Sequence, residues 1–186
     1  MSPNSGLQSA SSAPDRAAVC RLLLVRHAKA VPKHRPYDDI DRPLSKRGRA
    51  EAPLTGRWLA DSGFEPDLVL CSPARRTRQT WQLAVPALED PPPALYDERL
   101  YNAVPSVLVS ALTERARGLG SLVLVGHNPG IHDLAVGLCR SGPPELLERL
   151  KEGFPTSGVV VVDVPGGGQQ LSPGSGTLTA FWSPRD

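Results

Sequence analysis

The sequence predicts an α/β fold, a three-layer α/β/α sandwich around a mostly parallel sheet with an antiparallel edge. Short aliphatic or β-branched segments alternate with helical patterns through most of the chain. The first three of these segments are continuous apolar runs, which is typical of parallel strands covered by helices on both faces. The last two are joined by PGGGQQLSPGSG, a turn-rich stretch that favours antiparallel pairing.

Five segments have the length and composition of strands, and turn-forming residues bound each of them. The predicted strands are residues 21–25, 67–71, 121–125, 158–164 and 177–182.

Helices are predicted between these strands from cap residues and apolar spacing. Ser45 is expected to cap a helix that runs to about Ser62, in which Pro53 causes a kink or marks a late start. Ser72 and Asn128 each follow a strand and precede a proline, so both are predicted N-caps.

Two further helices complete the pattern. Ser106 is expected to cap a helix to about Arg117, and PPELLERLKEG predicts another that Gly153 ends.

One domain is expected over residues 19–186, because a chain of roughly 150 residues already buries about 70% of its unfolded surface. Residues 1–18 are rich in Ser, Ala and Pro, lack the pattern of a secretion signal and are predicted to form a disordered tail. The formal charge of +2 gives no reason to expect nucleic acid or a membrane as a partner. Apolar runs are far shorter than the roughly 20 residues that span a bilayer.

The three cysteines, Cys20, Cys71 and Cys139, are odd in number and have no C-x-x-C spacing. They are interpreted as free thiols that pack in the core of a cytoplasmic protein.

Residues that can bind an anion or take part in catalysis follow each of the first three predicted strands. Arg26 and His27 end the first, CSPARRTRQT follows the second, and GHNPG, residues 126–130, follows the third. Ligands of open α/β sheets bind at the carboxyl ends of the strands, and histidines, arginines and helix N-termini there favour an anion. Phosphate is the anion we expect.

A histidine that attacks phosphorus must be uncharged. Neighbouring guanidinium groups lower the pKa of an imidazole, because they disfavour a second positive charge. They also hold phosphate oxygens through charge-assisted hydrogen bonds of about 1.5 to 3 kcal/mol each. With positive charge from side chains, the site is expected to need no metal and no cofactor.

These motifs resemble the histidine phosphatase superfamily, and the SixA-type phosphohistidine phosphatases within it. LVRHAKA, SPARRTRQT, DERLY and VGHNPG carry the resemblance, which spans roughly residues 20–184. It implies a phosphoglycerate mutase-like fold and a metal-independent phosphatase. The implied substrate is a phosphorylated protein or a small phosphorylated molecule.

The resemblance also implies roles for four residues. His27 would be the nucleophile that becomes phosphorylated, and Arg26 would bind the phosphate. Arg76, four residues after the serine of SPARRTRQT, would be the pocket arginine. His127 would bind the phosphate and stabilise its charge in the transition state. His34 and His132 are interpreted as structural or solvated.

A general acid is the point where the chain departs from the family pattern. One register of DERLYN puts Asn102 where a glutamate is common, whereas a second register nominates Glu98. We favour Asn102. An acid accelerates loss of a sugar alkoxide about 100- to 10,000-fold, and an imidazole leaving from phosphohistidine gains much less. The missing acid therefore points to a P–N bond, and the KAVPKHRPYDD segment is expected to line the mouth of the site.

Other classes of protein fit less well. A cysteine phosphatase needs arginine six residues after Cys71, where Thr77 stands. A zinc hydrolase is disfavoured, since His127 and His132 are five apart instead of four. A small-molecule phosphomonoesterase, a phosphoglycerate mutase-like enzyme and a non-catalytic phosphate-binding adaptor remain alternatives.

Overall fold

A computed structural model describes residues 19–33, 37–168 and 171–185. The predicted tail of residues 1–18 and the predicted structural role of His34 lie outside these ranges.

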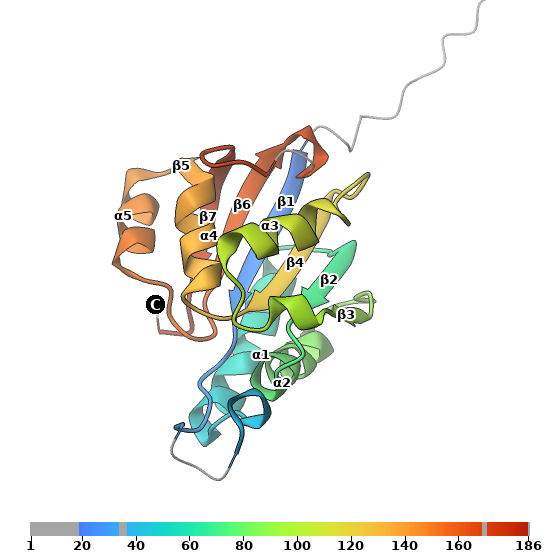
Figure 1. The fold of residues 1–186 in the computed structure, drawn as a ribbon, viewed down its shortest axis with the longest axis vertical. Coiled ribbons are helices and arrows are strands. Elements are labelled where there is room, and N and C mark those ends of the chain that lie inside the picture. The colour runs from blue at the N-terminus through green and yellow to red at the C-terminus, as the bar shows by residue number, and fades with distance from the viewer. Residues whose placement is uncertain (1–18, 34–36, 169–170, 186) are drawn as a thin grey trace, which may run out of the picture.

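Within them, seven strands form one sheet in the order β3-β2-β4-β1-β6-β7-β5 (Figure 1). The strands are β1 (Val19–Arg26), β2 (Leu68–Cys71), β3 (Ala94–Tyr96), β4 (Ser121–Gly126), β5 (Cys139–Ser141), β6 (Val159–Pro165) and β7 (Gly176–Trp182).

All five predicted strands are present, with ends that differ by one or two residues. Two strands were not predicted, β3 and β5, which are three residues long and lie at the two edges of the sheet. Segments this short carry little alternation or apolar signal, so sequence patterns do not separate them from loops.

The mostly parallel character of the sheet is confirmed, because β3, β2, β4 and β1 run parallel to one another. The predicted antiparallel pairing of the last two strands is also confirmed. Its position differs from the prediction, since β6 runs against both β1 and β7 inside the sheet and β5 adds parallel to β7 outside it. The reversed strand is therefore interior, and both edge strands are parallel to their neighbours.

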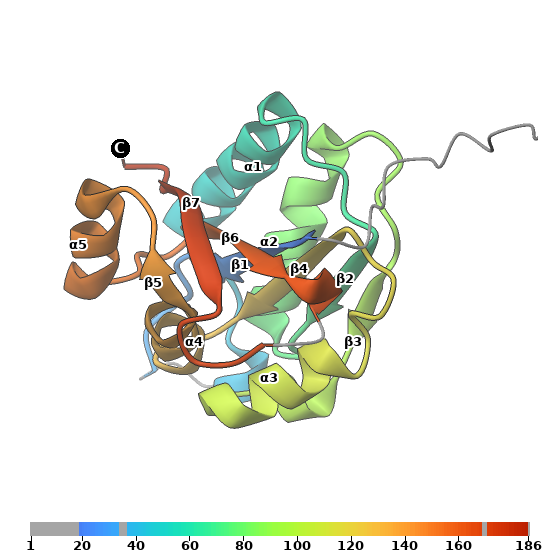
Figure 2. The ribbon, with the colours of Figure 1, turned by 90° about the horizontal axis from the view of Figure 1, so that it is seen from above.

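Helices cover both faces of the sheet and give the predicted three layers (Figure 2). On one face lie α1 (Lys46–Asp61) and α2 (Arg75–Ala84), and on the other α3 (Pro105–Thr113) and α4 (Gly130–Leu138). The fifth, α5 (Pro144–Glu152), lies near β5 and β7. Short 3-10 turns are η1 (Asp39–Asp41), η2 (Val85–Ala87), η3 (Glu98–Leu100) and η4 (Gly166–Gly168).

Alternation along β1 divides the core into two parts. Leu22 and Leu24 pack with α3 and α4, while Leu23 and Val25 pack with α1 and α2. None of these four side chains is more than 2% exposed. Burial of a leucine or valine of this kind contributes about 1.5 to 3 kcal/mol, so the central strand is fixed on both faces.

Helix boundaries agree best at α1. Ser45 caps it by accepting a hydrogen bond from the Gly48 amide, and Pro53 lies inside a helix that continues to Asp61. The predicted start of α3 is wrong by two positions, because the N-cap is Val104 and not Ser106, so Pro105 is the first helical residue. That helix also ends at Thr113, earlier than predicted.

The predicted caps Ser72 and Asn128 are wrong. The helices begin later, at Arg75 and Gly130, after Ala74 and Pro129. The Ser72 hydroxyl contacts His127, and the Asn128 side-chain amide donates to Phe154 O. Both polar side chains form hydrogen bonds to residues of other loops, so they do not cap the helices that follow them.

Candidate active site

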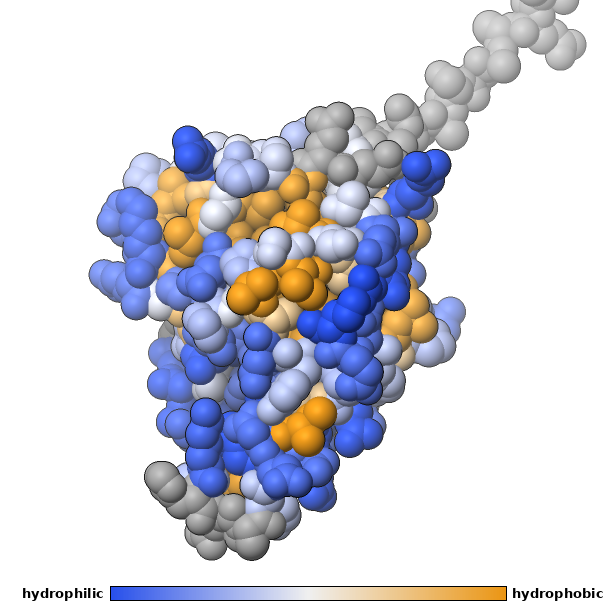
Figure 3. All heavy atoms as spheres, viewed as in Figure 1, coloured by the Kyte–Doolittle hydropathy of each residue, from blue (hydrophilic) through white to orange (hydrophobic). Residues whose placement is uncertain are grey.

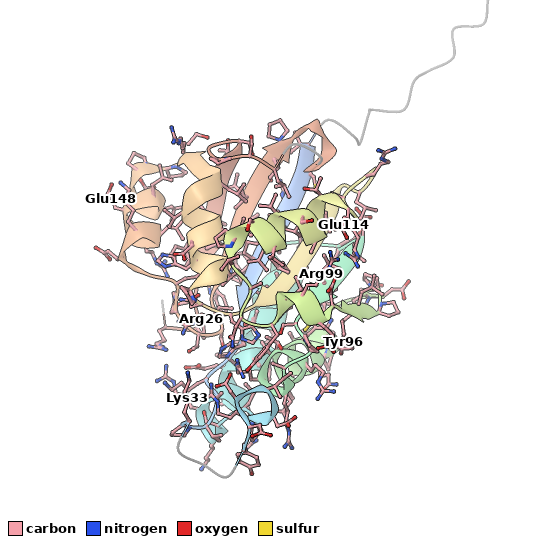
Figure 4. All side chains as sticks on the ribbon, viewed as in Figure 1. Arg26, Lys33, Tyr96, Arg99, Glu114 and Glu148 are labelled. Atoms are coloured by element: carbon pink, nitrogen blue, oxygen red, sulfur yellow. The ribbon has the colours of Figure 1, made fainter. Side chains whose placement is uncertain are left out.

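The carboxyl ends of β1 and β4 bring the two histidines together. These strands are parallel neighbours in which Arg26 pairs with Gly126, so the residues that follow, His27 and His127, leave the sheet side by side. Their ring centroids are 5.2 Å apart. The predicted convergence of both motifs at one sheet edge is confirmed, and Figure 4 shows Arg26 at this end of β1, above the loop that carries Lys33.

His27 is held by its backbone and by one ring nitrogen. Its amide donates to Gly126 O at 3.1 Å, and its carbonyl accepts from the Ser157 amide at 3.3 Å. The ring Nδ1 lies 2.7 Å from Ala28 O, which can only accept a hydrogen bond, so Nδ1 carries the proton. In the neutral ring Nε2 therefore holds the lone pair.

The pKa of His27 is lowered to about 3. Burial is the largest cause; the hydrogen bond to Ala28 O opposes it, and the charges of Arg76 and Arg26 add to the lowering. The predicted effect of the arginines is thus right in direction, but desolvation contributes more. At neutral pH the ring is uncharged, as a nucleophile must be.

His127 is 5% exposed and contacts the loop after β2. Its Nε2 lies 2.7 Å from the Ser72 hydroxyl, while its Nδ1 is buried without a hydrogen-bond partner among the described residues. Burial lowers the pKa of His127 to about 2, helped by His27 and Arg76.

Arg26 leaves the end of β1 and contacts the segment before β6. Its Nη1 donates to Phe154 O at 2.5 Å, and the Asn128 amide donates to the same oxygen. The Nε–H of Arg26 is buried and, in the described part of the chain, has no partner.

Arg76 lies in the first turn of α2 and is 2% exposed. Its Nη1 donates to Asp39 O at 2.5 Å and its Nη2 to Asp39 Oδ2 at 3.1 Å. The Nε–H is buried and unpartnered within the described ranges. The neighbours Arg75 and Arg78 are exposed, so the structure singles out Arg76 as the arginine buried beside the histidines.

Arg26, Arg76 and His127 therefore each keep one buried nitrogen without a partner in the described structure. Such groups are rare, because an unmet buried donor costs about 1 to 3 kcal/mol. An anion between the arginines and His27 would accept from all three. The N-terminus of α2, which begins one residue before Arg76, adds favourable potential for that anion.

Sequence reasoning missed the residues that surround Arg76. Asp39, in η1, pairs with both Arg76 and Arg42 and accepts from the Tyr101 hydroxyl at 2.7 Å. Burial raises the pKa of Asp39, but the hydrogen bond from Tyr101 and the charges of Arg76 and Arg42 outweigh it and lower that pKa to about 2. The available signals were that Asp39 lies in the KAVPKHRPYDD segment and Tyr101 in DERLY.

A pocket of about 400 Å³ opens beside this network. It is lined by Lys33, Tyr37, Asp39, Arg42, Tyr101 and Asn102. Three residues of the KAVPKHRPYDD segment, Lys33, Tyr37 and Asp39, line this pocket, in agreement with the prediction that the segment lines the mouth of the site. Figure 3 shows that this end of the molecule is mostly hydrophilic, which suits a polar substrate.

The two positions considered for a general acid, Asn102 and Glu98, differ in whether they line the pocket. Asn102 lines the pocket with a left-handed backbone, φ 49°. Glu98 lies in η3, where its side chain is exposed.

Remaining alternatives can be compared with the geometry. Where the structure describes the chain, no group of three or more His, Cys, Asp or Glu side chains is arranged to hold a metal ion. Nε2 of His132 lies 2.7 Å from Leu150 O, so the structural interpretation of this histidine is confirmed.

Cys71 is buried, and burial raises the pKa of its thiol to about 12, whereas a cysteine nucleophile needs a lowered pKa. No helix in the described ranges is long and apolar enough to cross a membrane.

A neutral imidazole beside a second histidine, the buried Arg76 and the half-buried Arg26 at the carboxyl ends of the strands of an α/β sheet has the features that a phosphatase with a histidine nucleophile requires. The chain belongs to the histidine phosphatase superfamily. Residues 22–103 match the family model described as histidine phosphatase superfamily, branch 1.

Known relatives agree with this assignment. An uncharacterized protein of Mycobacterium tuberculosis is 40% identical over 87% of this chain and 100% of its own length. Phosphohistidine phosphatase SixA of Escherichia coli is 29% identical over 82% of this chain and 94% of its own. A crystal structure from Agrobacterium tumefaciens, of a protein assigned as a phosphohistidine phosphatase SixA, superposes with a TM-score of 0.71 at 33% identity, covering 89% and 99% of the two chains. These likenesses support an enzyme, a phosphatase, over the non-catalytic adaptor.

Proposed function

We propose that this enzyme is a phosphohistidine phosphatase that works through a phosphorylated His27. The observation that carries the proposal is the absence of a carboxylic acid among the described residues of the pocket. Its one carboxyl group, Asp39, is an anion because Tyr101, Arg76 and Arg42 lower its pKa to about 2. Asn102 stands where an acid is expected in related phosphomonoesterases. A substrate whose leaving group needs no strong acid fits this site best.

The first step transfers the phosphoryl group to His27. Its Nε2 lone pair forms a bond to phosphorus in line with the departing P–N bond of the substrate. The electron pair of that bond goes to the leaving imidazole, which takes its proton from solvent through the open pocket. Arg26, Arg76 and His127 stabilise the equatorial oxygens with the three nitrogens that have no partner among the described residues.

The second step returns His27 to its starting state. Water attacks phosphorus, the bond from phosphorus to Nε2 breaks, and the pair of electrons returns to the ring. The hydrogen bond from Nδ1 to Ala28 O keeps the same nitrogen available for the next turnover. Phosphate leaves with the proton that water loses.

Relatives support the choice of substrate. The two relatives described above, from Escherichia coli and Agrobacterium tumefaciens, carry the SixA name. The match to this chain covers 94% and 99% of their respective lengths. We therefore take a phosphorylated histidine on a protein as the substrate class. The three cysteines, all buried and free, fit our further proposal that the enzyme works in the reducing cytoplasm.

A substrate panel tests the proposal. Phosphohistidine protein, phosphotyrosine peptide and a sugar phosphate are each assayed with and without EDTA. We expect kcat/KM to be at least about 100-fold higher for phosphohistidine, matching the advantage that an alkoxide gains from an acid, and no effect of EDTA. A preference for the sugar phosphate would overturn the substrate assignment and favour the small-molecule phosphomonoesterase. If the phosphoryl group is then returned to another position of the bound product, the result would favour a phosphoglycerate mutase-like enzyme.

Two variants separate the candidate acids. Glu98→Gln should leave turnover of all substrates within about twofold, because the Glu98 side chain is exposed in η3. Asn102→Asp places a carboxyl group in the pocket and should raise turnover of alkyl phosphates relative to phosphohistidine. Loss of ester hydrolysis in Glu98→Gln alone would instead identify Glu98 as the acid.

A further inference from the structure

Ser72 is buried at the centre of the site but has no place in the two steps above. It is 0% exposed and follows β2 directly. Its amide donates to Val125 O at 3.0 Å, and its carbonyl accepts from the Thr77 hydroxyl at 2.7 Å. The backbone of Ser72 is thus fixed between β4 and the first turn of α2, which leaves its hydroxyl in a defined position.

That hydroxyl has one partner among the described residues, Nε2 of His127 at 2.7 Å. Two arrangements are possible for a neutral ring. In the first, Ser72 donates to Nε2, and the ring proton is on Nδ1. In the second, Nε2 donates to Ser72, Nδ1 carries a lone pair, and the hydroxyl hydrogen has no acceptor in the described part of the chain.

The first arrangement satisfies the buried hydroxyl, and the second does not. Each arrangement leaves one buried donor unmet in the free protein, Nδ1–H in the first and the Ser72 hydroxyl in the second. The second also leaves the buried Nδ1 lone pair without a donor, so the first is favoured. The first arrangement also turns the unpartnered Nδ1 of His127 into a hydrogen-bond donor beside the two arginines. A lone pair there would repel the oxygens of a phosphate.

We propose that Ser72 is a positioning residue that fixes His127 as the Nδ1-protonated tautomer, so that an uncharged imidazole donates a hydrogen bond to the phosphoryl oxygens. Ser72 touches no substrate in this role. It acts through His127, whose contribution to the site comes from the proton that Ser72 directs to Nδ1. The inference rests on the proposed role of His127 and goes beyond it.

Nitrogen-15 NMR of histidine-labelled protein tests the tautomer directly, without any substrate. In the wild type we expect the His127 nitrogen with the protonated, pyrrole-type shift to be Nδ1. In Ser72→Ala the proton should move to Nε2 in a substantial fraction of molecules. A wild-type protein with the proton on Nε2 would overturn the proposal, whatever the substrate panel shows.

Kinetics provide the second readout. Ser72→Ala should lower kcat by about 100-fold, the cost of losing one donor to a transition-state oxygen, and Ser72→Thr should recover most of it. Ser121→Ala is the matched control, because that serine, the first residue of β4, is also buried but its hydroxyl donates to Glu65 O, away from the histidines. The control should lower the free energy of unfolding and leave kcat unchanged. A folded Ser72→Ala enzyme with kcat within twofold of wild type would contradict the proposal.

Discussion

Arg76 is held in place by Asp39 through two hydrogen bonds. Its Nη1 donates to the backbone oxygen of Asp39, and its Nη2 donates to Oδ2. The contact joins two segments that are 37 residues apart in the chain, the loop after β1 and the first turn of α2. It occupies two nitrogens of the guanidinium group and leaves Nε without a partner among the described residues. Asp39 therefore determines which part of Arg76 is available to an anion.

Asp39→Ala should lower kcat/KM by about ten- to 100-fold, because Arg76 would lose its hydrogen bond to Oδ2, and hydrogen bonds to charged groups contribute roughly 1.5 to 3 kcal/mol, while its bond to the backbone oxygen stays. Asp38→Ala is the control: it removes the same charge from the adjacent residue, which is exposed. Steady-state kinetics and the inhibition constant of inorganic phosphate measure both effects. Equal behaviour of the two variants would show that net charge, and not the position of Arg76, is what Asp39 supplies.

His27→Ala should remove essentially all turnover, because the other neutral imidazole of the site, His127, has its Nε2 bonded to Ser72 and, in the proposed tautomer, its proton on Nδ1. Brief reaction of the wild type with radiolabelled phosphohistidine protein should trap an acid-labile label, absent from the variant. His132→Ala removes a histidine whose Nε2 bonds Leu150 O, and it should lose stability while it keeps its turnover. Labelling of His27→Ala at the wild-type level would place the nucleophile elsewhere.

Burial and the nearby arginines should keep His27 and His127 from titrating between about pH 8 and 5, since their pKa values are lowered to about 3 and about 2. NMR signals of both rings, followed in phosphate-free buffer, measure this. A ring that protonates near its ordinary pKa of about 6.5 would contradict the description of the site.

The same lowering links stability to pH. The unfolded chain takes up protons on these histidines near pH 6.5, and the folded protein does so only near pH 3 or below. Their contribution to stability is therefore complete above about pH 6.5 and is lost as the pH falls from there towards 3. His27→Gln should show a smaller loss of unfolding free energy between about pH 7 and 5 than the wild type.

Two glycines of α4 provide a test of the packing behind the site. In Gly130→Ala the added methyl group would overlap the Ala103 carbonyl oxygen, so we expect a loss of about 1 to 3 kcal/mol in the free energy of unfolding. Gly137→Ala meets nothing within 4 Å and should gain up to about 1 kcal/mol from better helix propensity. Denaturant unfolding compares them, and similar stabilities would mean that α4 does not approach Ala103 so closely.

The sequence by itself determined the architecture and the main contents of the site. The apolar runs of β1 and β4 predict parallel buried strands, and parallel strands carry the residues after them to the same edge. Arg26, His27 and His127 could therefore be brought together from their order alone. Periodicity could not reveal β3 and β5, because three residues are too few to show it. It also could not reveal that β6 lies between β1 and β7, which depends on pairing between segments distant in the chain.

Only the tertiary structure decided how the site side chains are held. Ser72 was predicted to cap a helix, a local role that its position before a proline suggests, but the hydroxyl bonds His127, 55 residues away. Asp39 belongs to the segment that was expected to line the mouth of the site, but its pairing could not be predicted, since its partners Arg76 and Tyr101 are 37 and 62 residues away. Sequence patterns report local periodicity and capping, whereas these contacts depend on where two distant loops meet once the sheet has formed. For the same reason burial, the largest cause of the low pKa of His27, could not be read from its neighbours in the chain.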